Sequence, residues 1–168
     1  MSYQEKKTIV QILTGALLLA AYCIYAFNKI QTGMAASEDM KFWAAAILIF
    51  IGIGVVASIV IQIAFHILLS IAIAVKQRAQ NEKCEDKEIE KTIKLEMVED
   101  EMHKLVELKA MKIGFAVVGF GFIAALVSLV LNYSPAVMLN ILFLFFCVGS
   151  MLEGIIQVYF YRKGVRNG

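Results

Sequence analysis

The stretch that decides the fold is KQRAQNEKCEDKEIEKTIKLEMVEDEMHKLVELKAMK, residues 76–112. It holds 9 of the 16 Lys and Arg residues and 10 of the 14 Asp and Glu residues, whereas the long apolar runs on either side are nearly free of charge. So many charges cannot enter lipid, and the flanks are too apolar for a protein dissolved in water. The charged stretch therefore fixes how the rest of the chain is placed relative to a membrane.

The composition agrees with a membrane protein of one domain. Hydrophobic residues make up 60% of the 168 residues, charged residues make up 18%, and there is one proline. The formal net charge of +2 is small, and the basic residues alternate with acidic ones. This pattern argues against a nucleic-acid partner, which is recognised by a basic patch, and leaves the lipid bilayer as the predicted environment.

Four apolar segments predict four membrane-spanning helices. They are residues 8–27, 42–62, 113–131 and 136–161, each close to the 20 residues, or about 30 Å, that a helix needs to cross a bilayer. The first is expected to remain as an uncleaved span. The second belongs to a charge-free run, residues 42–75, which is too long for the membrane, so we expect the helix to continue to about residue 78. Extreme tilt is the competing interpretation.

A cytoplasmic helix is predicted over residues 87–112, where apolar residues recur every three or four positions. In one interpretation its apolar face covers residues 63–75 in an antiparallel hairpin. In the other, an exposed stripe docks a second copy or a cytoplasmic protein, and its residues are Met97, Val98, Met102 and Leu105. The predicted fold is an all-α, four-transmembrane-helix bundle, one integral membrane domain over residues 1–168, with a long cytoplasmic helical hairpin between helices 2 and 3.

The orientation follows from the distribution of Lys and Arg residues. The beginning of the chain, the charged stretch and the end of the chain together hold 14 of them, whereas the opposite side has only Lys29 and Lys41. Because positive loops stay inside, both termini and the charged stretch are predicted to be cytoplasmic.

Two segments carry a resemblance to a known group. They are VEDEMHKLVELK (residues 98–109), which runs into a span, and GSMLEGIIQ (residues 149–157), which leads to YFYRKG (residues 159–164). The chain resembles small four-span integral membrane proteins of Gram-positive bacteria, a family without an established activity. The resemblance implies the architecture and a location in the bacterial plasma membrane, and it assigns no catalytic role.

Glu153 is the only acidic or basic residue inside a predicted span, where a carboxylate is costly. By helical rise, Gln62 and Gln157 share its depth in the membrane, and His66 lies one turn deeper. These four residues form a candidate ligand or ion site. The alternative interpretation is a hydrogen-bond cluster that holds the bundle together.

Small residues on the third span predict close helix packing. They recur at Gly114, Gly121, Ala125 and Ser128. The three cysteines, Cys23, Cys84 and Cys147, share no C-x-x-C spacing and are expected to be reduced.

The sequence has no phosphate loop, G-x-S-x-G or H-E-x-x-H motif, and its only histidines are His66 and His103. We therefore expect no enzymatic activity, metal or cofactor. The first functional hypothesis is a regulatory or scaffolding membrane protein that acts through its cytoplasmic helix. The second is an oligomeric small transporter or channel subunit with a polar intramembrane site around Glu153.

Overall fold

The computed structural model describes residues 3–32, 39–80 and 101–163, and within these ranges the protein is all-α. The helices are α1 (Tyr3–Gln31), α2 (Met40–Gln80), α4 (Glu101–Val130) and α5 (Pro135–Lys163). All four are long and apolar enough to cross a membrane. The prediction of four long apolar helices is confirmed.

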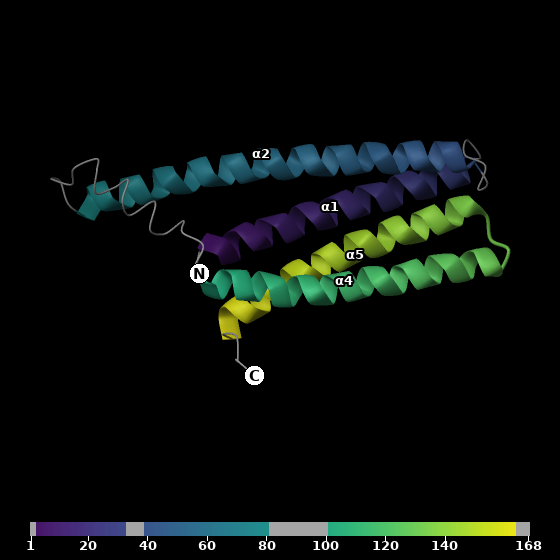
Figure 1. Ribbon diagram of the computed structural model, residues 1–168. Helices are drawn as coiled ribbons and strands as arrows, with labels where there is room; N and C mark the ends of the chain where they lie inside the picture. The colour runs from purple at the N-terminus through teal and green to yellow at the C-terminus, as the bar shows by residue number, and fades with distance from the viewer. Residues whose placement is uncertain (1–2, 33–38, 81–100, 164–168) are drawn as a thin grey trace.

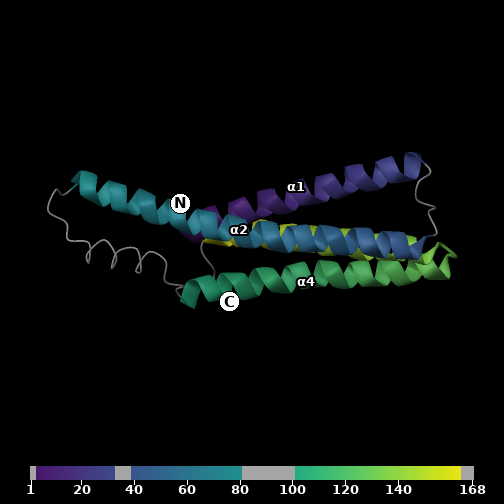
Figure 2. The ribbon, with the colours of Figure 1, turned by 90° about the horizontal axis from the view of Figure 1, so that it is seen from above.

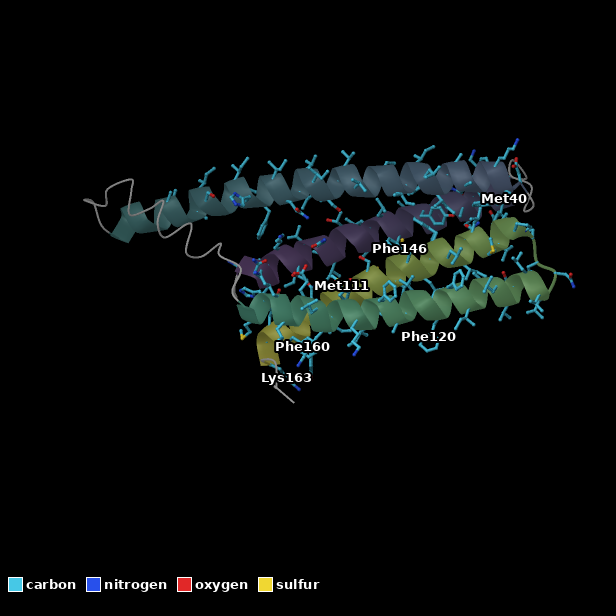
Figure 3. All side chains as sticks on the ribbon, in the orientation of Figure 1. Met40, Met111, Phe120, Phe146, Phe160 and Lys163 are labelled. Carbon is cyan, nitrogen blue, oxygen red and sulfur yellow. The ribbon has the colours of Figure 1, made fainter. Side chains whose placement is uncertain are left out.

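The distribution of apolar side chains is that of a protein surrounded by lipid. Large hydrophobic residues on the outside of the helices are mostly uncovered; Leu17, for example, is 72% exposed and Phe115 is 77% exposed. Figure 3 shows Phe120 pointing away from the other helices. In water such a surface would drive association, whereas in a bilayer it meets hydrocarbon.

The helices alternate in direction and form a long bundle. In Figure 1, α2 and α4 lie on opposite sides, with α1 and α5 between them. One end, called here the terminal end, holds the start of α1 and the end of α5; the other, the loop end, holds residues 32 and 131–134. The most extensive packing joins α4 to α5, followed by α1 to α5, whereas α2 has only sparse contacts with α1 and α5.

Local signals set the helix boundaries at the loop end. The backbone N–H of Phe42 donates to Asp39 Oδ1 (3.1 Å), so Asp39 is the N-cap of α2. After α4, Asn132 adopts a left-handed conformation (φ 61°), which asparagine tolerates better than most residues. Pro135 then occupies the first position of α5, where its missing N–H costs nothing.

Helix α2 continues well beyond a bilayer's thickness. Its 41 residues correspond to about 62 Å, and Figure 2 shows it extending past the start of α4. Residues 81–100, which include Met97, Val98 and most of the predicted cytoplasmic helix, lie outside the described residues. The described part of that helix is the start of α4, which runs without a break through Lys112. The cytoplasmic hairpin as a whole stays a prediction.

Candidate functional site: a polar cavity beside Glu153

A cavity of about 410 Å³ lies between α1, α2 and α5. Its lining is apolar towards the loop end, where Leu18, Ile51 and Phe143 lie, and more polar towards the terminal end. Its polar residues are Thr8, Gln11, Thr14, Ser58, Ser150, Glu153 and Gln157. Figure 3 shows Phe146, another lining residue, on α5 beside α1. The cavity therefore combines a polar end and an apolar end within the apolar lengths of three helices.

A short chain of hydrogen bonds crosses from α1 to Glu153. The hydroxyl of Thr8 lies 2.9 Å from the carbonyl oxygen of Gln4 and 3.4 Å from Gln157 Oε1. The side-chain N–H of Gln157 donates to Glu153 Oε1 (3.3 Å). Gln157 therefore orients one carboxylate oxygen. The hydroxyl of Thr8 has one hydrogen and lies nearer to the Gln4 carbonyl, so its link to Gln157 is the weaker of its two. These side chains link α1 to α5 at the polar end of the cavity.

The side chain of Glu153 is also held from the α4 side. A Cβ atom at Gly114 would lie 3.0 Å from Glu153 Cβ and 3.3 Å from Glu153 Oε2, so only glycine allows α4 to approach this closely. Within the described ranges, no ion pair and no hydrogen bond to Oε2 accompany the bond from Gln157. The site therefore presents a carboxylate with one oxygen occupied and with no cation of the described chain beside it.

Two further polar links join α1 to α5 on either side of the cavity. Towards the loop end, the hydroxyl of Tyr22 donates to Asn140 Oδ1 (2.5 Å), and the Tyr22 ring packs against Phe143. At the terminal end, Arg162 Nε donates to Glu5 Oε1 (2.7 Å). The Glu5 side chain is buried, whereas the Arg162 side chain is 62% exposed. These links hold the ends of the α1–α5 pair, and the cavity lies between them.

The structure brings together two of the four predicted site residues. Glu153 and Gln157 line the cavity and are hydrogen-bonded to each other. Gln62 lines a separate, very small cavity between α1 and α2, which shares Gln11, Thr14 and Ser58 with the large one. His66 lines neither cavity and is exposed.

Two of the four residues in the predicted interaction stripe lie in the part of the chain that the structure describes, and other helices leave both partly exposed. Met102 is 50% exposed and Leu105 is 39% exposed, whereas Val106 and Ala110 on the same helix are fully buried. His103 lies between these two groups, with its ring 5.3 Å from that of Tyr161. The first turns of α4 therefore have one buried face and one uncovered face, and the uncovered face includes Met102 and Leu105.

Sequence reasoning did not assign Thr8 to the site or predict the pairing of Glu5 with Arg162. Thr8 is the first residue of the first predicted span, and Glu5 lies in the polar lead before it. The positions of these residues in the chain could have indicated the contacts, because the start of α1 and the end of α5 lie on the same side of the membrane. The charges of Glu5 and Arg162 are complementary, so the pair could have been proposed on that basis.

No protein-family model, curated protein or solved structure matches this chain. Residues 3–32, 39–80 and 101–163 contain no group of three or more His, Cys, Asp or Glu side chains that could hold a metal ion. Two of the cysteines, Cys23 and Cys147, are free thiols, and Cys84 lies outside the described residues. The chemistry available to the cavity is therefore that of its carboxylate, amide and hydroxyl groups.

Proposed function

We propose that this chain is a small membrane transport subunit, a transporter or channel component that binds its ligand or ion at Glu153. The observation that carries the proposal is a carboxylate without an ion pair among the described residues, lining a cavity of about 410 Å³. A carboxylate within an apolar span is costly and usually marks a binding site or a proton pathway. The cavity's size falls within the range of small-molecule sites, about 300–1,000 Å³.

The role of Glu153 would be to attract and release a positive charge. When the carboxylate is ionised, the surrounding apolar helices make a nearby cation or proton favourable, because attraction is weakly screened at low dielectric. Four helices are few for a complete pathway, so we propose that the working unit contains at least two copies. The hydrogen bond from Gln157 would then orient the carboxylate through its oxygen Oε1.

The experiment is an ion-flux measurement in proteoliposomes with the wild type, Glu153→Gln and Asp39→Asn. Gln keeps the shape of the Glu153 side chain and removes its charge. Asn at position 39 removes a charge at the loop end and still caps a helix, so it is a matched control. We expect cation or proton flux in the wild type and the control, and a loss in Glu153→Gln. Equal flux in all three proteins, or none above empty liposomes in the wild type, would refute the proposal.

For the orientation, we propose that the terminal end faces the cytoplasm of a bacterial plasma membrane. The supports are the Lys and Arg distribution and the resemblance to small four-span proteins of Gram-positive bacteria. The test is a single cysteine placed among residues 86–100 of a chain without other cysteines. We expect a membrane-impermeant thiol reagent to label it in inverted vesicles and not in intact cells; labelling only in intact cells would invert the arrangement.

A second candidate function is regulation or scaffolding through the start of α4. The uncovered side chains of Met102 and Leu105 favour it, because they lie among the charged residues Lys104, Glu107 and Lys109, outside the most apolar part of the helix. We expect Leu105→Glu to lower the fraction of dimer measured by light scattering in detergent, with Lys104→Gln as the control. An unchanged oligomeric state would remove the support for self-association through this face.

A further inference from the structure

We infer that the ligand of the Glu153 cavity is a lipophilic organic cation, one that combines a single positive charge with an apolar body. This inference rests on the proposed function, because it assumes that the cavity is a binding site, and it names the chemical class of the ligand. Three properties of the cavity carry it: its charge, the distribution of its polarity, and its size.

The charge of the site favours a cation. Glu153 is the only acidic or basic side chain among the residues that line the cavity. The nearest described cationic group along α5 towards the terminal end is Arg162, about 13 Å away by helical rise, and it is paired with Glu5. On α1, Lys7 lines the small neighbouring cavity but not this one. An anionic ligand would meet the carboxylate in a lining without a cationic side chain, whereas a cation would neutralise it.

The polarity of the lining changes along the cavity. Glu153, Gln157 and Thr8 lie towards the terminal end. Leu18, Ile51 and Phe143 lie towards the loop end and supply an apolar wall. An inorganic cation beside this wall would lose part of its hydration shell and would find no oxygen ligands there to replace it. An organic cation would bury its apolar body against the same wall.

The size and the donor set argue against a bare metal ion. A calcium ion takes six to eight oxygen ligands and a magnesium ion demands a near-ideal octahedron. The described residues supply no group of three or more metal-binding side chains. A volume of about 410 Å³ is far larger than a single ion needs and suits an organic molecule. The carboxylate of Glu153 is the one acidic group in the lining that could meet the cationic group of such a ligand.

The experiment compares two ions of the same shape and opposite charge, tetraphenylphosphonium and tetraphenylborate. Their binding to the full chain in lipid nanodiscs is measured by equilibrium dialysis, and binding to empty nanodiscs is subtracted. We expect tetraphenylphosphonium to bind the wild type and Asp39→Asn equally. In Glu153→Gln its affinity should fall at least about tenfold, the size of one lost charge-assisted contact. Tetraphenylborate should show no binding beyond that to lipid.

Two further variants keep the test decisive if Glu153→Gln folds poorly. Glu153→Asp retains the charge and should bind more tightly than Glu153→Gln. Ser58→Phe adds a bulky group to the lining on α2 and should abolish binding without a change of charge. Equal affinity for the two ions, or an affinity that does not change in Glu153→Gln, would overturn the inference.

The failure of the inference can be told apart from the failure of the proposed function. If flux in proteoliposomes depends on Glu153 but tetraphenylphosphonium does not bind, the site takes a proton or an inorganic ion, and the inference alone is wrong. If neither flux nor binding depends on Glu153, both are wrong, and the hydrogen bonds of Glu153 serve only to hold the bundle together.

Discussion

On the side of α5 that faces α4, glycine residues bring the two helices into backbone contact; on the side that faces α1 and α2, a cavity of about 410 Å³ separates the helices. A Cβ atom at Gly149 would lie 2.9 Å from the carbonyl oxygen of Gly114, and one at Gly121 would collide with the ring of Phe145. On the cavity side, a Cβ atom at Gly15 would meet only Cγ of Met151, at 3.7 Å, although one at Gly154 would lie 2.6 Å from Cγ1 of Ile12, so α1 approaches α5 closely at that point.

The comparison shows what decides packing among helices of similar hydrophobicity. Lipid is as apolar as the helix surfaces, so apolar side chains alone do not favour one helix contact over another. Small residues on matching faces allow α4 and α5 to close, whereas on the other side of α5 a close approach at Gly154 lies beside an open cavity. The two sides of α5 therefore differ in packing: one is in close contact with α4, and the other borders a cavity.

The largest effect on stability is expected for Gly121→Ala, because the added methyl group has no space beside Phe145. We expect a loss of about 1–3 kcal/mol in the free energy of unfolding, measured by titration with a denaturing detergent. Gly119→Ala is the matched control on the same helix, since nothing lies within 4 Å of its added Cβ. On the cavity side, Gly15→Ala should be tolerated as well as the control. Equal losses at all three positions would contradict the difference between the two sides.

A smaller effect is expected for Tyr22→Phe, which removes the hydrogen bond from α1 to Asn140. The expected loss is about 1 kcal/mol, typical of a hydrogen bond between membrane helices. Tyr25→Phe is the control, because the rings of Tyr22 and Tyr25 both pack against Phe50, but the Tyr25 hydroxyl has no hydrogen bond among the described residues. If Tyr22→Phe and Tyr25→Phe lower the free energy of unfolding by the same amount in this titration, the hydrogen bond between Tyr22 and Asn140 does not stabilise the packing of α1 against α5.

The smallest effect is expected for Arg162→Gln, which removes the ion pair with Glu5. Because the Arg162 side chain is 62% exposed, water and salt screen the pair, and we expect a loss below about 1 kcal/mol that shrinks further at high salt. Lys163→Gln, on the neighbouring residue, controls for the loss of a positive charge at the terminal end. A loss that is the same at low and high salt would show that the pair does not act through its charges.

The sequence was sufficient to predict the four apolar helices and the packing face of α4. Gly114, Gly121, Ala125 and Ser128 are all buried in the structure, as their spacing indicated. Length and composition indicate the spans, because a bilayer sets the length of a span, and the spacing of small residues indicates the packing face. The closed side of the bundle was therefore predictable.

The cavity side was harder to predict, because depth in the membrane does not fix the direction in which a side chain points. Gln62 was placed at the depth of Glu153 by helical rise, yet it lines the small neighbouring cavity, and His66 lines neither. Helix α2 is apolar on nearly every face, so its hydrophobic pattern does not set its rotation. Which residues of α1 and α2 face Glu153 depends on tertiary contacts, such as that of Gly154 with Ile12.

The most direct test of the open cavity is the reactivity of single cysteines with a water-soluble, charged methanethiosulfonate reagent. In a chain with Cys23, Cys84 and Cys147 replaced by alanine, Ser150→Cys places a thiol in the cavity lining, and Val148→Cys places one on the opposite face of α5 at nearly the same depth. The thiolate is the reactive form, and it forms in a polar, hydrated site but not in hydrocarbon. We predict rapid labelling of Ser150→Cys and almost none of Val148→Cys; equal rates at the two positions would contradict a polar cavity on this side of the bundle.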